Sequence, residues 1–180
     1  MGEKKIIKIG LAGNPNCGKT TIFNAITGAR QKVGNYAGVT VEKKEGKRIY
    51  KDVEFVIFDL PGVYSLTAYS MDEVVARDFI IEEKPDIIID VIDSTNIERN
   101  LYLLLQFQEL GVPLIGALNI SDQAESMGIR IDSDNLSKLL GLSLVKTVGT
   151  RGEGIETLLD ETITLYDKKN VYKNNISYGF

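Results

Sequence analysis

A glycine-rich loop directly follows a short apolar run near the start of the chain, and this combination leaves few folds open. Ile6–Ala12 has the length and composition of a buried strand, and the next eight residues read Gly-Asn-Pro-Asn-Cys-Gly-Lys-Thr. The glycines let backbone N–H groups face phosphate oxygens, and a helix over Thr21–Ile26 would place its N-terminus behind them. Lys19 would supply positive charge to the β- and γ-phosphates, and the Thr20 hydroxyl would reach Mg²⁺. The loop therefore predicts phosphate binding.

The remainder of the chain alternates strand-like runs with helical patterns. This alternation with short links predicts an α/β fold with a doubly wound, mostly parallel sheet. We expect an antiparallel edge strand at Val41–Tyr50, which is charged and would pair with the run that follows it. Ser70 and Thr95 are each followed three residues later by Glu, which predicts two capping boxes at helix starts. The expected buried strands are Ile6–Ala12, Val53–Phe58, Ile87–Ile92, Val112–Leu118 and Leu142–Val148.

Composition excludes several classes of function. The chain of 180 residues has no histidine and one cysteine, Cys17, which excludes Ser-His-Asp catalysis, a disulfide framework and Cys- or His-rich metal sites. The net charge of −4 argues against a nucleic-acid partner. We find no apolar run of membrane-spanning length and no signal-peptide core, so we expect this part of the chain to be soluble and cytosolic.

A second motif predicts the Mg²⁺ shell. Asp59-Leu60-Pro61-Gly62 leaves an apolar strand; its Asp can hold Mg²⁺ and the N–H of Gly62 can face a γ-phosphate. The Gly-rich segment Ala29–Thr40 precedes it and is expected to be ordered by a triphosphate. Thr40 has the only aliphatic hydroxyl in that segment, so we expect it to provide the second hydroxyl for Mg²⁺.

A third motif predicts that the base is guanine. Asn119-Ile120-Ser121-Asp122 follows the next strand, and the Asp122 carboxylate can accept from both N1–H and the exocyclic amine of guanine, a pair of donors that adenine lacks. In the loop Gly149-Thr150-Arg151, a backbone N–H is placed to meet guanine O6. Four motifs at four strand ends, in this order, point to a Ras-like P-loop GTPase.

The residue after Asp59-Leu60-Pro61-Gly62 bears on the rate of hydrolysis. Many GTPases carry a Gln there that orients the attacking water, whereas this chain has Val63. Arg30 and Arg48 are candidates for an internal arginine finger by location only. We therefore expect a slow intrinsic GTPase that needs help from a cation or a partner.

These motifs together resemble the GTPase domain of the bacterial and archaeal ferrous iron transport protein B. The resemblance covers roughly residues 6–165, and it implies a cytosolic domain at the N-terminus of a larger membrane protein that imports Fe²⁺. A helical domain and a membrane permease portion would follow, at the cytoplasmic face of the cell membrane. Asp167–Phe180 lacks apolar periodicity, so we expect a G domain at 1–166 and a polar linker at 167–180. The segments that carry the resemblance are Gly13–Thr20, Val33–Lys44, Asp59–Leu66, Asn100–Leu103 and Ala117–Asn119.

The resemblance also implies roles for individual residues. In related K⁺-activated GTPases a P-loop Asn helps to hold K⁺; here that residue is Asn16, with carbonyl groups near Asn35–Gly38 completing the ligands. The chain departs from the family at Tyr36-Ala37, where Trp-Pro is usual. The expected catalytic residues are Asn16, Lys19, Thr40 and Gly62, and the expected Mg²⁺ ligands are Thr20, Thr40 and Asp59. Contacts to GTP or GDP are expected from Asn14, Pro15, Asn16, Cys17, Gly18, Lys19, Thr20, Thr21, Gly38, Val39, Thr40, Asp59, Gly62, Asn119, Asp122, Gly149, Thr150 and Arg151.

Three other interpretations stay open from the sequence. A free-standing regulatory GTPase in RNA modification or ribosome assembly shares the P-loop Asn and the apolar residue after the second motif. A non-hydrolysing GTP/GDP sensor is compatible with Val63. A P-loop kinase or ATPase would leave Asn119 and Asp122 without a role. We expect no iron site in this domain, because the imidazole and thiolate ligands that Fe²⁺ sites often use are lacking.

Overall fold

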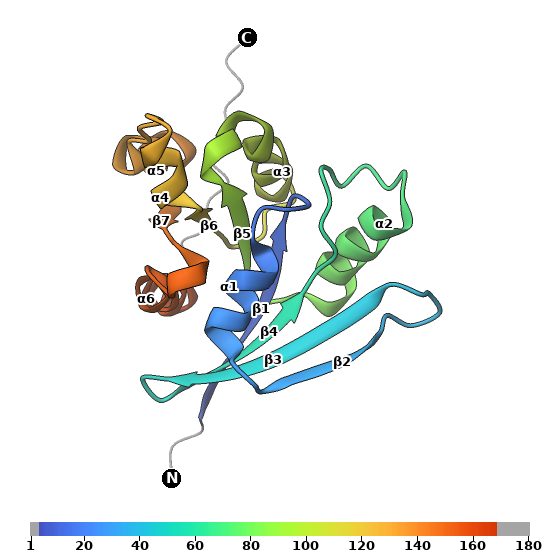
Figure 1. The fold of residues 1–180 in the computed structure, drawn as a ribbon. Coiled ribbons are helices and arrows are strands. Elements are labelled where there is room, and N and C mark those ends of the chain that lie inside the picture. Colours follow the sequence, from blue (N-terminus) through green and yellow to red (C-terminus); the bar gives the residue numbers. More distant parts are fainter. Residues whose placement is uncertain (1–3, 169–180) are drawn as a thin grey trace.

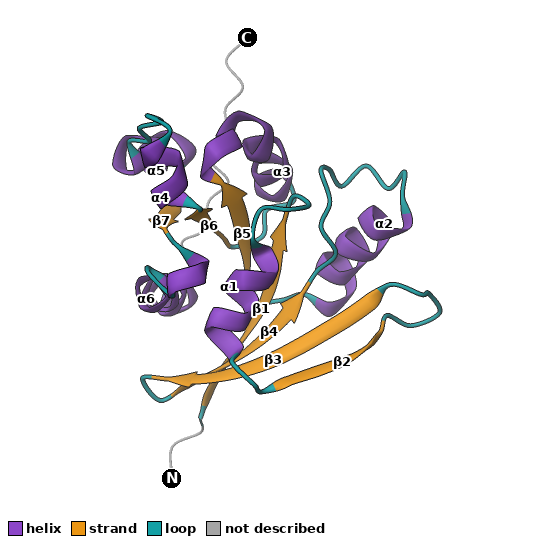
Figure 2. Ribbon diagram, in the orientation of Figure 1, coloured by secondary structure: helices purple, strands orange, loops and turns teal. Residues whose placement is uncertain are grey.

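A computed structural model of the chain describes residues 4–168, which form one sheet of seven strands with helices on both faces (Figure 1, Figure 2). The strands lie in the order β2-β3-β4-β1-β5-β6-β7. In chain order the elements are β1 (Lys5–Gly13), α1 (Lys19–Thr27), β2 (Gln31–Asn35), β3 (Glu42–Tyr50), β4 (Val53–Asp59), α2 (Met71–Asp78), a π-helical turn (Phe79–Glu83), β5 (Ile87–Asp93), a 3-10 turn (Ser94–Asn96), α3 (Ile97–Glu109), β6 (Leu114–Asn119), α4 (Ser121–Ser126), α5 (Ser133–Leu140), β7 (Ser143–Lys146), a 3-10 turn (Gly149–Arg151) and α6 (Ile155–Asp167).

The predicted α/β architecture is confirmed. β1 is flanked by β4 and β5 in parallel register, and β6 and β7 continue the parallel part of the sheet. β3 pairs antiparallel with β4, as expected from the charged Val41–Tyr50 segment. Because the carboxyl ends of the parallel strands meet at one edge of the sheet, the loops after β1, β4, β6 and β7 gather there.

The antiparallel edge of the sheet has one more strand than the sequence pattern predicted. Gln31–Asn35, inside the expected ligand-ordered segment, forms β2 and pairs antiparallel with β3 from Gln31–Gly46 to Asn35–Glu42. Four of its five residues are exposed, so it lacks the apolar alternation by which a strand is found in sequence. The Gly-rich segment Ala29–Thr40, expected to be ordered by a triphosphate, therefore contains a strand followed by a loop.

Two apolar cores lie on opposite faces of the sheet. One packs α1 and α6 against the strands, with Phe23 and Leu158 fully buried. The other packs the α2 region and α3, with Phe79 and Phe107 buried. Figure 1 shows α1 and α6 on the opposite side of β1 and β5 from α3. The sheet is thus doubly wound and holds the strand-end loops on a rigid base.

Of the two predicted capping boxes, one is confirmed and one is wrong. The Ser70 hydroxyl accepts from the Glu73 N–H and the Glu73 side chain accepts from the Ser70 N–H, which completes the box that starts α2. At Thr95 the hydroxyl instead donates to Asp93 at 2.6 Å, and α3 begins at Ile97 without a side-chain cap. The Asp93 carboxylate at the end of β5 binds the Thr95 hydroxyl, which the capping box would need as its acceptor.

The predicted linker lies almost wholly outside the described residues. α6 continues to Asp167, one residue beyond the expected boundary of the G domain. Residues 169–180 are not described.

Candidate functional site

The loop after β1 has the backbone that the sequence predicted for a phosphate-binding loop. Gly18 lies in the left-handed region with φ of 83°, directly before α1, and Asn16 has φ of 63°. A Cβ on Gly18 would overlap the side-chain nitrogen of Asn119, so only glycine fits there. A Cβ on Gly13 would lie 2.6 Å from the sulfur of Cys17. The two glycines let the loop close around the start of α1.

Lys19 and Asp59 form an ion pair at the centre of the site. Their side chains are only 11% and 9% exposed. Lys19 is the first residue of α1 and Asp59 is the last residue of β4, so the pair joins the phosphate-binding loop to the second motif. Removing two charges from water carries a desolvation cost even when they pair, and an anion at Lys19 together with a cation at Asp59 would give each of them a further opposite charge.

Backbone contacts attach the second motif to the first. The Leu60 N–H donates to the Leu11 carbonyl at 2.9 Å, and the Val63 N–H donates to the Gly13 carbonyl at 3.1 Å. A Cβ on Gly62 would lie 3.2 Å from the backbone of Pro15, so this glycine packs directly on the phosphate-binding loop. The structure thus brings Gly62 and the loop together, as the sequence predicted.

Two adjoining hollows lie in front of these residues. One has a volume of 560 Å³ and the other 650 Å³, and both are lined by Lys19, Thr20 and Asp72. The first also contains Thr40 and Asp59, so the three expected Mg²⁺ ligands share one hollow. The second contains Asn14, Pro15, Asn16, Gly18 and Gly62. Most of the predicted phosphate-end residues therefore line these two hollows.

The sequence analysis missed Asp72, which lines both hollows. It stands in the first turn of α2, next to the capping Ser70. An acid in a first helical turn is ordinary, because it complements the helix dipole. The pattern therefore contained no signal that would have separated Asp72 from a plain helix start.

Two of the predicted residues in the segment before β3 lie away from the hollows. Gly38 is exposed with φ of 74°, and the Val39 N–H donates to the Tyr36 carbonyl at 3.3 Å in a turn. Neither lines the two hollows, whereas Thr40 lines the first. The structure does not bring Gly38 and Val39 to the phosphate end of the site.

Tyr36 anchors that segment to the second apolar core. Its ring meets Phe79 edge-on with centroids 6.5 Å apart, and the Lys43 ammonium lies 5.6 Å from the ring centroid. Burial, followed by the charges of Asp59 and Glu83, raises the pKa of the Tyr36 hydroxyl above its ordinary value. This tyrosine is therefore a neutral packing residue.

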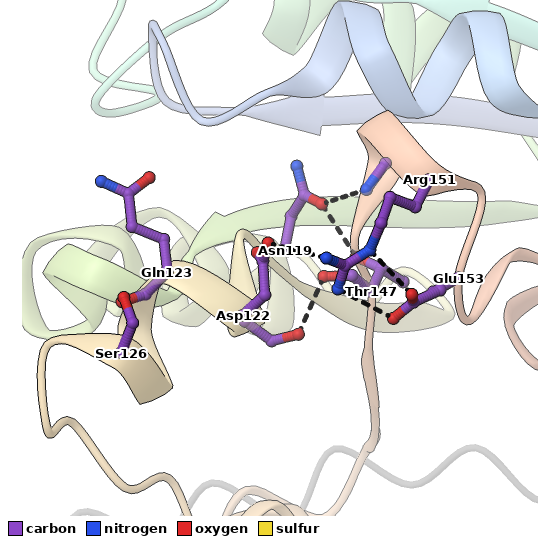
Figure 3. A network of polar contacts seen from close by, with 9 residues as sticks. Asn119, Asp122, Gln123, Ser126, Thr147, Arg151 and Glu153 are labelled. Carbon is purple, nitrogen blue, oxygen red and sulfur yellow. Dashed lines mark hydrogen bonds and ion pairs between the residues drawn. The ribbon is translucent and has the colours of Figure 1, made fainter.

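Asn119 connects the two ends of the site, and Figure 3 shows it at the base end beside Thr147, whose hydroxyl lies 3.2 Å from the Asn119 Oδ1. It is 2% exposed; its Nδ2 donates to the Cys17 carbonyl at 3.1 Å, and its Oδ1 accepts from the Gly149 N–H at 3.0 Å. The loop after β6 is thus bonded to both the phosphate-binding loop and the loop after β7. Thr21, in the first turn of α1, packs beside Gly149.

Asp122 and Arg151 lie at the open side of the base end. The Arg151 Nη1 is 3.6 Å from the Asp122 carboxylate, and its Nε donates to Glu153 at 2.7 Å. Thr150 is exposed in the same short turn. Ile120, between Asn119 and Asp122, has φ of 58°, an uncommon backbone for a β-branched residue. This strain turns the chain sharply, so that Asn119 points inward and Asp122 lies on α4.

Cys17 of the predicted site and Val63, which follows the second motif, have buried side chains with no evident catalytic role. Burial raises the pKa of the Cys17 thiol to about 12, so this cysteine is a protonated packing residue at neutral pH. Val63 is 4% exposed and lies in the second apolar core. Neither side chain is placed to activate water.

Two kinds of structure are absent from residues 4–168. No group of three or more His, Cys, Asp or Glu side chains is arranged to hold a metal ion in that range. Nor does any helix there have the length and apolarity needed to cross a membrane.

Comparison with known proteins agrees with this geometry. A sequence model of the family described as Ferrous iron transport protein B matches residues 7–162. The Fe(2+) transporter FeoB of Salmonella typhimurium is 54% identical over 158 residues, which are 86% of this chain and 20% of that protein. A fusion protein of Fe(2+) transport protein A and Fe(2+) transporter FeoB from Porphyromonas gingivalis is 46% identical over 177 residues, 97% of this chain and 21% of the relative. The chain therefore spans about a fifth of the length of these relatives.

Solved structures identify which part of such proteins this is. The FeoB G-domain from Methanococcus jannaschii is 48% identical with a TM-score of 0.81, covering 91% of this chain and 99% of that one. The cytosolic domain of T. maritima FeoB in a GDP form is 43% identical with a TM-score of 0.93, covering 97% of this chain and 69% of that one. The chain belongs to the ferrous iron transport protein B family and corresponds to its G domain.

Proposed function

We propose that this domain binds GTP and hydrolyses it slowly, as the cytosolic regulatory part of a ferrous iron transporter. The observation that carries the proposal is the connection made by Asn119, which bonds the loop behind Lys19 to the loop that would face guanine O6. A phosphate end and a base end held in one rigid arrangement fit a nucleoside triphosphate. The Asp122 carboxylate selects guanine, because adenine lacks the two donors that it would accept.

The residues present fit Mg²⁺. A hard divalent cation takes oxygen ligands, and the hydroxyls of Thr20 and Thr40 and the carboxylate of Asp59 share one hollow. The cation would neutralise charge on the β- and γ-phosphates. Lys19 would then turn from Asp59 to the phosphates, and the Gly62 N–H would hold the γ-phosphate from the other side.

Slow hydrolysis follows from what would surround a γ-phosphate. The Val63 side chain is buried and has no polar atom, so it cannot orient the attacking water. No arginine among the described residues lines either hollow, so the stabilisation of transition-state charge that an arginine finger supplies is lacking there too. We therefore infer a low intrinsic rate.

Asn16 is the residue that would hold K⁺. It is exposed, and it lines the second hollow beside Gly62 and Lys19. The carbonyl groups near Asn35–Gly38 do not line that hollow, so the proposal of K⁺ assistance rests on the Asn16 amide alone. We propose Asn16 as a catalytic-site residue on this basis.

The wider role is proposed from the relatives. Residues 1–166 would form the G domain, and 167–180 would link it to a helical domain and a membrane portion that carries the iron, at the cytoplasmic face of the membrane. No nucleic-acid partner and no iron site are assigned to this domain.

The test is GTP hydrolysis by the purified domain in K⁺ buffer and in Na⁺ buffer, with ATP as the control nucleotide. We expect slow GTP turnover that K⁺ stimulates, no ATP turnover, and loss of the K⁺ effect in Asn16→Ala. The hydrolysis that remains in Lys19→Ala gives the rate of any contaminating hydrolase. Equal slow rates in both salts would remove K⁺ from the proposal, and GTP binding without any turnover would leave a nucleotide sensor.

A further inference from the structure

The guanidinium of Arg151 lies between two carboxylates at the base end of the site (Figure 3). It makes two bonds to Glu153, from Nε at 2.7 Å and from Nη2 at 3.3 Å. Its remaining terminal nitrogen, Nη1, is 3.6 Å from Asp122. Glu153 therefore holds Arg151 by two hydrogen bonds, whereas Asp122 makes only a longer ion pair.

The backbone fixes this arrangement. Arg151 ends the 3-10 turn after β7, and Gly152 follows with φ of 68°, which reverses the chain. Glu153 then forms a bridge to Val148, with its N–H donating at 3.2 Å and its carbonyl accepting at 3.1 Å. The Glu153 side chain is thus held beside the arginine two residues before it.

We propose that Glu153 is a positioning residue that keeps the Asp122 carboxylate available to guanine, by retaining the guanidinium of Arg151. This inference rests on the proposed binding of guanine nucleotides. Asp122 must offer both carboxylate oxygens to the base, so a guanidinium bonded to Asp122 competes with guanine for the same acceptor.

The bonds of Arg151 to Glu153 favour guanine in this competition for Asp122. When guanine enters, only the contact of Arg151 to Asp122 at 3.6 Å must break, and the two bonds to Glu153 remain. Without the charge on Glu153, the nearest carboxylate left to Arg151 is Asp122. The guanidinium would then bind Asp122 more closely and weaken nucleotide binding.

The experiment is a double-mutant cycle read by the affinity and dissociation rate of a fluorescent GDP with Mg²⁺. The variants are Glu153→Gln, Arg151→Gln and the pair combined. The matched control is Glu156→Gln, which removes the same charge from an exposed position in the first turn of α6. Each protein is measured at low and at high salt, and thermal unfolding without nucleotide checks that each variant is folded.

We expect Glu153→Gln to weaken GDP binding by about two- to five-fold at low salt, the effect of one exposed ion pair. The loss should shrink at high salt, because screening weakens the Arg151–Asp122 pair that forms in its place. In the Arg151→Gln background the same change should have no effect, and Glu156→Gln should bind as the wild type does.

Two results would overturn the inference while leaving GTP binding intact. The first is equal affinity of Glu153→Gln and wild type. The second is an equal loss with and without Arg151, which would mean that Glu153 only supports the loop. If the wild type binds no guanine nucleotide at all, the proposed function fails and this inference fails with it.

Discussion

At the scale of single residues, Gly18 shows how one position can decide the site. Its left-handed backbone alone costs an L-residue about 1–2 kcal/mol. A Cβ there would also strike the Asn119 side chain, which bonds the phosphate-binding loop to the base end. We expect Gly18→Ala to abolish GDP binding, as measured by titration with a fluorescent GDP.

Gly128 is the control for this change. It has φ of 80°, close to that of Gly18, but nothing lies within 4 Å of the Cβ it would gain. Gly128→Ala should lose about 1–2 kcal/mol of stability and keep its nucleotide affinity. If both variants bind GDP equally well, the contact with Asn119 has no importance for the site.

Asp90 is a buried acid in the middle of β5. The sequence pattern did not single it out, because it lies inside an apolar run. It is 1% exposed and its Oδ2 has no hydrogen-bond partner among the described residues. Burial raises the pKa of this carboxyl well above its ordinary value of 3.8. The folded chain therefore keeps a proton that the unfolded chain releases as pH rises.

Because the pKa of Asp90 is higher in the folded chain than in the unfolded chain, the stability of the fold depends on pH. The contribution of Asp90 is fully present below pH 3.8 and is lost as pH rises from there towards the raised pKa of the folded state. Asn has the shape of the protonated acid and does not titrate, so Asp90→Asn avoids this loss of stability at higher pH. Urea unfolding should thus show Asp90→Asn more stable than wild type at neutral pH, with a difference that grows with pH.

The exposed Asp134→Asn controls for removal of a negative charge. A difference between Asp90→Asn and wild type that stays constant from about pH 4 to about pH 8 would contradict a neutral, buried Asp90.

At the scale of elements, the capping box of α2 also orders the loop that leads from the second motif. Glu73 accepts from the Tyr69 N–H at 2.8 Å, from the Ser65 hydroxyl at 3.1 Å and from the Thr67 hydroxyl at 3.2 Å. These bonds, the one from Tyr69 first, lower the pKa of Glu73. A single carboxylate therefore joins the start of α2, which carries Asp72, to the chain that follows Gly62.

Removing the cap tests this organisation. Ser70→Ala should destabilise the domain by about 1 kcal/mol, the usual cost of losing an N-cap hydroxyl. The measurement is the free energy of unfolding in urea. Ser133→Ala is the control, because α5 is capped by Asp132 and Ser133 is already inside the helix. Equal losses in the two variants would mean that the box contributes nothing.

Elements differed in how well the sequence predicted them. The buried parallel strands and α1 were predicted because short apolar runs rich in Val and Ile and a glycine-rich loop have few alternatives. β2 was missed because it is exposed and contains Gly34, so its pairing comes from β3 and not from its own pattern. The capping box at Thr95 failed because Asp93, at the end of the strand before it, competed for the hydroxyl.

At the scale of the whole molecule, the phosphate end was predictable because parallel strands deliver their loops to one edge. That rule places Lys19, Asp59 and Asn119 together without any knowledge of side chains. It gives no information on contacts between loops of unrelated sequence. Asp72 at the hollows and the pairing of Arg151 with Glu153 depend on those contacts, and so they needed the structure.

The joined site also predicts how the whole domain responds to its ligand. A ligand that binds only the folded state stabilises it by RT ln(1 + [L]/Kd), about 2.7 kcal/mol at 100 times Kd. For a domain of this size, that corresponds to a rise in Tm of roughly 5–10 °C. We expect Mg²⁺ with GDP to produce this rise in thermal unfolding, whereas Mg²⁺ with ADP should not.

The same measurement separates the two ends of the site. Lys19→Ala should remove most of the rise by weakening phosphate binding. Asp122→Ala should reduce the rise with GDP by removing the acceptor for the base, and should leave the small response to ADP unchanged. If ADP raised Tm as much as GDP in the wild type, Asp122 would not read the base, and the phosphate end would bind nucleotides without regard to it. The linkage of the two ends through Asn119 would then serve only the stability of the loops.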